Sequence, residues 1–141
     1  MTRPLLILNG PNLNRLGTRE PEIYGTTTLA EIERLCRAED PDLVFRQSNS
    51  EQQLIEWIHD AIDGAAGIVI NPAAFSFTSI ALLDALKMFP GPIVEVHLSN
   101  IHRREPLYHR SLVSLAATGV IAGLGPQGYV LAIRALKQRQ R

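Results

Sequence analysis

A tyrosine, an arginine and a histidine are the side chains of this sequence best suited to acid–base chemistry. Arg19 and Tyr24 lie close together in one polar segment, whereas His97 follows an apolar run much later in the chain. Neutral tyrosine is a poor base, but a nearby guanidinium favours the phenolate, which can remove a proton next to a carbonyl group. An imidazole can then protonate a departing hydroxyl group.

Asparagine side chains supply a partner for the negative charge that such a reaction develops. Asn12 lies in the same segment as Tyr24, and Asn71 follows a different apolar run. Amide groups beside a carbonyl oxygen stabilise an enolate. Together these residue types describe an elimination of water from a hydroxy-ketone without a cofactor.

Each of these residues also has an ordinary structural explanation. A loop tyrosine usually packs against its neighbours, and a histidine at the end of a strand commonly bonds to the backbone. Arg19 beside Glu20 is compatible with a surface ion pair, and asparagines often serve turns. Glu95 can simply anchor a basic neighbour, and Asp84 fits the solvent face of a helix. Residue types alone therefore predict an α/β protein with a polar pocket.

The elements that must position these residues alternate along the chain. Continuous apolar runs, typical of strands covered on both faces, alternate with amphipathic helical stretches, and this order favours a parallel sheet between helices. We therefore expect one α/β domain over residues 1–141 with five parallel strands. The predicted strands are 5–8, 43–45, 68–70, 93–96 and 119–122, and the predicted helices begin near 28, 50, 78 and 126.

The segment 9–25 is much longer than an ordinary connection between a strand and a helix, which takes about 2–6 residues. It carries asparagines, arginines and a tyrosine between glycines. In a parallel α/β sheet, ligands bind beyond the carboxyl ends of the strands, where this segment begins. We expect it to close over a polar ligand and to bring Tyr24 with it.

Composition narrows the class of protein. The formal net charge is zero, which gives no electrostatic drive toward nucleic acid or an anionic membrane. No apolar run reaches the ~18 residues of a membrane span, and the start of the chain lacks the order of a signal peptide. Cys36 is the single cysteine, so no intrachain disulfide can form. We expect a cytoplasmic protein that acts on a small molecule.

Several kinds of chemistry are disfavoured. Both lysines, Lys87 and Lys137, lie in predicted helices away from the strand ends, which argues against a Schiff base. The four histidines have no metal-ligand spacing with cysteine or acidic residues, and phosphate-binding glycine motifs are missing. The sequence therefore predicts neither a metal nor a cofactor.

Several ordered motifs give the whole chain a family resemblance. They are the segments 8–13, 19–25, 46–51, 95–100 and 117–121. With them, the chain resembles the type II 3-dehydroquinate dehydratases, which have a three-layer αβα, flavodoxin-like fold and assemble as trimers within a dodecamer. This family converts 3-dehydroquinate to 3-dehydroshikimate in the shikimate pathway and in quinate breakdown.

The resemblance implies a role for each candidate residue. Tyr24 would be the base, with Arg19 favouring its phenolate, and His97 would be the general acid. Four further residues or groups of residues would assist them. Asn12 would stabilise the enolate, and Glu95 would orient His97. Asn71, with the backbone of Leu98 and Ser99, would hold the substrate carboxylate. Asp84 would reach the substrate of an adjacent subunit.

Two positions depart from the family pattern. Phe77 replaces a histidine and Tyr108 replaces an arginine, and in the family both serve ring hydroxyls away from the reacting carbons. The departures concern recognition rather than proton transfer. Either a lower affinity for 3-dehydroquinate or a related substrate is then expected, unless Arg104, His109 or Arg110 reaches in to compensate.

Two other functions remain open at this level. One is the same elimination on a related hydroxy-keto acid, and the other is a catalytically weak binding or assembly module of the same fold. A phosphoacceptor signalling domain is disfavoured because Asn9 and Asn71 stand where carboxylates would be needed.

Overall fold

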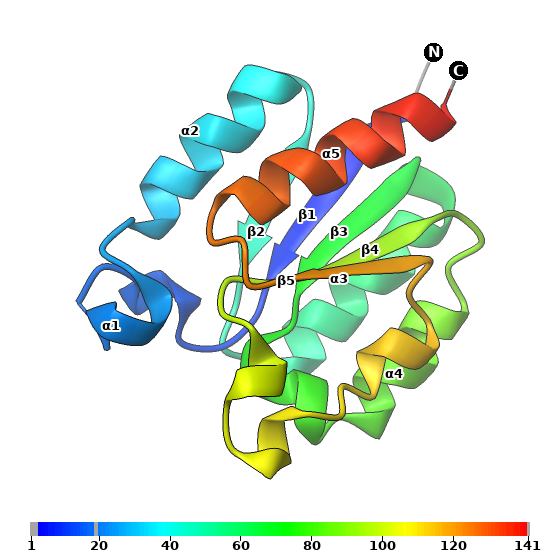
Figure 1. The fold of residues 1–141 in the computed structure, drawn as a ribbon. Coiled ribbons are helices and arrows are strands. Elements are labelled where there is room, and N and C mark those ends of the chain that lie inside the picture. Colours follow the sequence, from blue (N-terminus) through cyan, green and yellow to red (C-terminus); the bar gives the residue numbers. More distant parts are fainter. Residues whose placement is uncertain (1–2, 19, 141) are drawn as a thin grey trace.

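One parallel sheet organises the protein in the computed structural model, which describes residues 3–18 and 20–140 (Figure 1). The strand order is β2-β1-β3-β4-β5, the order of flavodoxin-like folds. The predicted five-stranded parallel α/β fold is confirmed. The strands are β1 (Leu5–Asn9), β2 (Val44–Gln47), β3 (Gly67–Asn71), β4 (Ile93–His97) and β5 (Gly119–Ala122).

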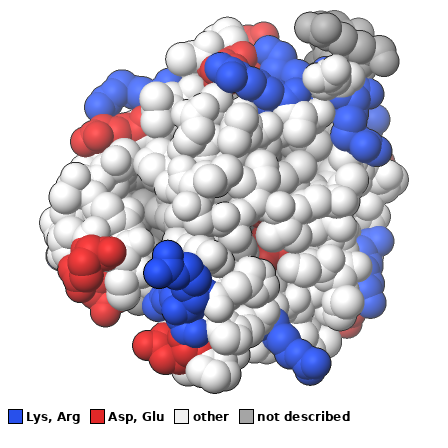
Figure 2. All heavy atoms as spheres, in the orientation of Figure 1, with Lys and Arg blue, Asp and Glu red and all other residues white. Residues whose placement is uncertain are grey.

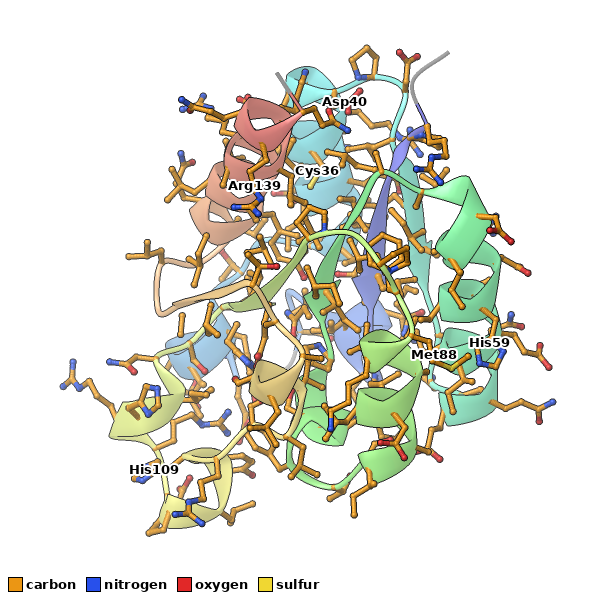
Figure 3. All side chains as sticks on the ribbon, turned by 90° about the vertical axis from the view of Figure 1, so that its right-hand side faces the viewer. Cys36, Asp40, His59, Met88, His109 and Arg139 are labelled. Atoms are coloured by element: carbon orange, nitrogen blue, oxygen red, sulfur yellow. The ribbon has the colours of Figure 1, made fainter. Side chains whose placement is uncertain are left out.

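Helices cover both faces of the sheet. One layer consists of α2 (Leu29–Glu39) and α5 (Gln127–Arg139), and the other of α3 (Glu51–Gly64) and α4 (Ile80–Lys87). Figure 3 shows these layers edge-on, with Cys36 and Arg139 on one side of the sheet and His59 and Met88 on the other. The strands β1, β3 and β4 are buried along their whole length, as their apolar sequences require.

Side-chain caps fix where three helices begin. Thr28 Oγ1 accepts a hydrogen bond from the Glu31 amide, and Ser50 Oγ accepts one from the Gln53 amide, both at 3.2 Å. These contacts confirm the predicted helix starts near 28 and 50. The third helix begins at Ile80 rather than near 78, because Ser79 caps it and the preceding residues form a 3₁₀ turn.

The predicted strand 43–45 was placed too early. Pairing between β1 and β2 continues through Asn9 and Gln47, so backbone hydrogen bonding carries both strands into polar residues. The strands β1, β3 and β4 end at Asn9, Asn71 and His97. Three polar side chains therefore lie at one edge of the sheet.

The surface carries no dominant charge on the face shown in Figure 2, where basic and acidic groups are scattered between uncharged areas. Within residues 3–18 and 20–140, no helix is both long and apolar enough to cross a bilayer. In the same part of the chain, no three metal-ligating side chains cluster together. Burial raises the pKa of the Cys36 thiol to about 12, so this cysteine is not a candidate nucleophile.

Candidate active site

A cavity of about 100 Å³ opens beyond the carboxyl ends of β1, β3 and β4. Its walls come from the segment after β1, the turn after β3 and the segment after β4. Seven predicted site residues line it, together with Phe77 and Arg104. The seven are Asn12, Tyr24, Asn71, His97, Leu98, Ser99 and Tyr108.

The segment after β1 is folded rather than extended. It contains a 3₁₀ turn over Leu13–Arg15 and the short helix α1 (Pro21–Tyr24), neither of which the sequence analysis predicted. Tyr24 is half-buried at the end of α1 and packs against the core. Arg19, the predicted partner of Tyr24, lies outside the described residues.

Close backbone approach joins this segment to the turn after β3. A Cβ atom at Gly10 would lie 2.4 Å from the Pro72 carbonyl oxygen, so only glycine fits there. Asn12 adopts a left-handed conformation with φ of 69°, and its backbone N–H donates to Asn49 Oδ1 at 2.9 Å. Ala73, which also lines the cavity, is left-handed too, with φ of 51°. Such backbone strain is concentrated at functional sites.

Alternation along β4 puts Glu95 and His97 on the same face of the sheet. Glu95 is fully buried and His97 is 5% exposed. The Glu95 Oε2 atom is hydrogen-bonded to His97 Nε2, and Oε1 accepts from Ser114 Oγ at 2.6 Å. Because Nε2 is engaged, Nδ1 is the nitrogen through which His97 would exchange a proton with the cavity. Glu95 thus orients the imidazole.

The charge of Glu95 is stabilised despite its burial. Desolvation acts to raise the pKa of this carboxyl, but hydrogen bonds from His97 and Ser114, together with the nearby Ser111 hydroxyl, hold it below its usual value. The carboxylate lies directly against a ring nitrogen, where the two groups can share one proton. The pair is therefore suited to deliver a proton to a leaving group.

A buried polar network fixes Asn71. Its Nδ2 atom donates to the Tyr129 hydroxyl at 3.0 Å, and that hydroxyl donates to Asn9 Oδ1 at 2.7 Å. The Asn71 Oδ1 atom accepts from the Ala73 amide at 3.2 Å. Because an amide nitrogen carries two protons, one remains for a ligand in the cavity. Burial raises the pKa of Tyr129, so its hydroxyl stays protonated.

We expect Tyr129→Phe to lower the free energy of unfolding by about 1–3 kcal/mol, because two buried amide groups lose their partner. The loosened Asn71 should also raise KM more than it lowers kcat. Urea denaturation and steady-state kinetics measure the two effects. Unchanged stability and KM would show that this network does not order the cavity.

Arg104 is one of three basic residues expected as possible replacements for the missing imidazole and guanidinium. Its guanidinium carbon lies 5.4 Å from the centre of the Tyr24 ring and 4.0 Å from that of Tyr108. The structure brings Arg104 to the cavity wall, whereas Arg110 is exposed and does not line it. His109 lies in the outer part of the same segment, where its Nε2 contacts the Arg104 carbonyl (Figure 3).

Phe77 and Tyr108 form one wall of the cavity, here called the aromatic wall. Their ring centres are 5.3 Å apart in an edge-to-face arrangement. Phe77 also stacks near His97, with ring centres 6.3 Å apart. The wall offers one hydroxyl and two ring faces. Its recognition of ligands therefore differs from that of the histidine and arginine that the family pattern has at these two positions.

Asp84 is not part of this cavity. It is exposed on α4 and does not line the cavity of its own chain. Its predicted contact with the substrate of an adjacent subunit stays a prediction.

Comparisons with known proteins agree with this geometry. The family model described as "Dehydroquinase class II" matches residues 3–137. A 3-dehydroquinate dehydratase of Bartonella bacilliformis is 55% identical over 100% of this chain and 92% of its own, and one of Streptomyces coelicolor is 58% identical over 92% and 86%. The crystal structure of type II dehydroquinase from Propionibacterium acnes superposes with a TM-score of 0.91 and 49% identity, covering 98% of both chains. The chain therefore belongs to the class II dehydroquinase family.

Proposed function

We propose that the protein is a 3-dehydroquinate dehydratase, a hydro-lyase that forms 3-dehydroshikimate without a cofactor. One observation carries the proposal: Tyr24 and a Glu95-linked His97 face the same cavity, at the sheet edge where this fold binds ligands. Relatives that cover nearly the whole chain at more than half identity are named for this activity. The product belongs to the shikimate pathway, and quinate breakdown uses the same conversion.

The proposed reaction begins at Tyr24. Its phenolate oxygen takes a proton from the carbon next to the ketone, and the electrons of that C–H bond form the enolate. The Arg104 guanidinium lies by the Tyr24 ring and places a positive charge beside the proposed base. Arg19 is proposed to assist it in the same way. Tyr24 ends this step protonated.

The second step involves His97. As the enolate returns to a ketone, its electrons form the new carbon–carbon double bond and the C–O bond breaks. His97 supplies a proton to the departing hydroxyl, which leaves as water, and Glu95 stabilises the imidazolium until then. The overall reaction removes one water and consumes no electron donor or acceptor.

The other cavity residues bind rather than react. Asn12 is proposed to stabilise the enolate oxygen from the rim of the cavity. Asn71 would hold the substrate carboxylate with its remaining amide proton, together with the backbone of Leu98 and Ser99. All four line the cavity, which supports this division of roles.

The aromatic wall favours a second candidate, the same elimination on a hydroxy-keto acid with fewer hydroxyls at its far end. If the wall limits binding of 3-dehydroquinate, the double variant Phe77→His with Tyr108→Arg should lower KM about tenfold or more, because each new group can hydrogen-bond a ring hydroxyl. The kcat should change little. An unchanged KM in a parent that is already efficient would refute this selectivity.

We also propose that the chain forms a homo-oligomer, a trimer-based dodecamer by analogy with its family. Ile80 and Met88 are 64% and 57% exposed, and they flank the exposed Asp84 on α4. Side chains spaced four residues apart share one helix face, so this apolar patch surrounds a carboxylate. Light scattering coupled to size exclusion should give a mass well above that of one chain, and a monomer would contradict it. The cytoplasmic location stays a prediction.

The proposed activity is tested with purified protein dialysed against a metal chelator. Incubation with 3-dehydroquinate should produce the ultraviolet absorbance of a conjugated enone, with a product lighter by one water. A folded protein that yields no product at high substrate concentration would refute the proposal. Turnover of a deoxygenated analogue in that case would favour the second candidate.

A further inference from the structure

Two serines beside the buried Glu95 carboxylate have no part in the reaction above. Ser111 and Ser114 belong to the segment between Tyr108 and β5, and Ser114 lies in a 3₁₀ turn over Val113–Leu115. Although Ser114 is an exposed residue, its hydroxyl points inward and donates to Glu95 Oε1 at 2.6 Å. The carboxylate is therefore held from two sides, by His97 on Oε2 and by Ser114 on Oε1.

This arrangement matters because Glu95 is completely buried. A buried carboxylate keeps its charge only if hydrogen bonds replace the water that it has lost. Its register neighbours on β3 and β5 are Ile70 and Val120, which offer no charge or side-chain hydrogen bond. His97 is the ionisable group that acts on it. The serine hydroxyls are thus its neutral donors.

Ser111 provides a second observation. Its hydroxyl oxygen is buried and has no partner of good hydrogen-bonding geometry among the described residues. It nevertheless lies near enough to Glu95 to contribute to the lowered pKa of that carboxyl. Buried hydroxyls without partners are rare, and this one faces an anion with unused lone pairs.

The backbone holds the serine segment against the site. The Leu112 amide donates to the Ser76 carbonyl at 2.7 Å, next to Phe77 of the aromatic wall. The Thr118 amide donates to the Ile93 carbonyl, also at 2.7 Å, at the start of β4. Ser111 directly precedes the first anchor, and Ser114 lies between the two. Their position relative to Glu95 is therefore set by the fold.

We propose that Ser114, assisted by Ser111, is a positioning residue that keeps Glu95 ionised and oriented, so that the shared proton stays on His97. The inference rests on the proposed dehydratase reaction for its kinetic consequence, but its structural part concerns the Glu95–His97 pair alone. Without the hydroxyl, the proton moves toward Glu95. The imidazole then faces the cavity with a neutral N–H, which is a far weaker acid.

The direct test is Ser114→Ala, with Ser114→Thr as the variant that keeps a hydroxyl. Loss of one hydrogen bond to a charged group should lower kcat about tenfold. KM should stay within about twofold, since Ser114 does not touch the cavity. The alkaline limb of the kcat–pH profile should shift to higher pH by about half a unit or more, because a less stabilised carboxylate holds the shared proton of the pair more tightly. Ser114→Thr should restore both values.

Ser50→Ala is the matched control, because Ser50 Oγ also makes one hydrogen bond but caps α3 away from the cavity. It should lower stability and leave the pH profile unchanged. A similar shift of the profile in Ser50→Ala would show that Ser114 acts only through stability. If Ser114→Ala does not fold, Ser111→Ala takes its place, with a smaller shift in the same direction.

Nuclear magnetic resonance separates this inference from the activity itself. With no substrate present, the imidazole nitrogen signals of His97 should lie closer to those of a neutral ring in Ser114→Ala than in the parent, because the shared proton moves toward Glu95. Such a change without any turnover would refute the dehydratase reaction and preserve the role of Ser114. Identical imidazole signals in the two proteins would overturn the inference.

Discussion

Replacing Tyr24 by phenylalanine is expected to lower kcat on 3-dehydroquinate by about 10²–10⁴-fold, the usual contribution of a general base. The change removes one oxygen and keeps the ring that contacts Arg104 and the core. KM should therefore change much less than kcat. Steady-state measurement of enone formation provides both constants.

Tyr108→Phe is the comparison that makes this result specific. Tyr108 lines the same cavity and contacts the same guanidinium, but it belongs to the aromatic wall. Its loss of a hydroxyl should affect KM more than kcat. Equal losses of kcat in the two variants would mean that Tyr24 is not a distinct base.

Replacing His97 by asparagine should have a comparable effect, a fall in kcat of about 10²–10⁴-fold. Asparagine can still hydrogen-bond the buried Glu95, so the carboxylate keeps a partner, but it cannot deliver a proton. Circular dichroism and urea unfolding establish that the variant is folded before its kinetics are compared.

His59→Asn is the matched control for His97. His59 is exposed on α3, on the outer side of the helix layer, and does not line the cavity (Figure 3). Its replacement should leave kcat and KM within about twofold of the parent, as expected for a surface residue. A His97 variant that is as active as the His59 variant would show that His97 is not the general acid.

The fold follows from local signals in the sequence. The strands are continuous apolar runs because both of their faces are covered. Two helices begin where a threonine or serine hydroxyl accepts a hydrogen bond from the first turn. The pairing of Glu95 with His97 also follows from local geometry, since residues two apart in a strand share a face. These features depend on neighbours in the sequence, which is why they are predictable.

Other features of the site depend on contacts between distant segments. Arg104 approaches Tyr24 only because the segments after β1 and β4 meet over the same sheet edge. The aromatic wall likewise joins the turn after β3 to the segment after β4. The serine hydroxyls on Glu95 come from a connection with no periodic pattern. No spacing rule relates such pairs, so the sequence could not place them.

The division of labour between Tyr24 and His97 is tested most directly by running the reaction in D₂O with three proteins: the parent, Tyr24→Phe and His97→Asn. If Tyr24 removes the proton and His97 protonates the leaving hydroxyl, His97→Asn should place solvent deuterium beside the ketone of unreacted 3-dehydroquinate faster than it forms the enone. Tyr24→Phe should do both far more slowly than the parent, in line with its expected loss of kcat. Deuterium uptake by Tyr24→Phe at the rate of the His97 variant would contradict the assignment of Tyr24 as the base.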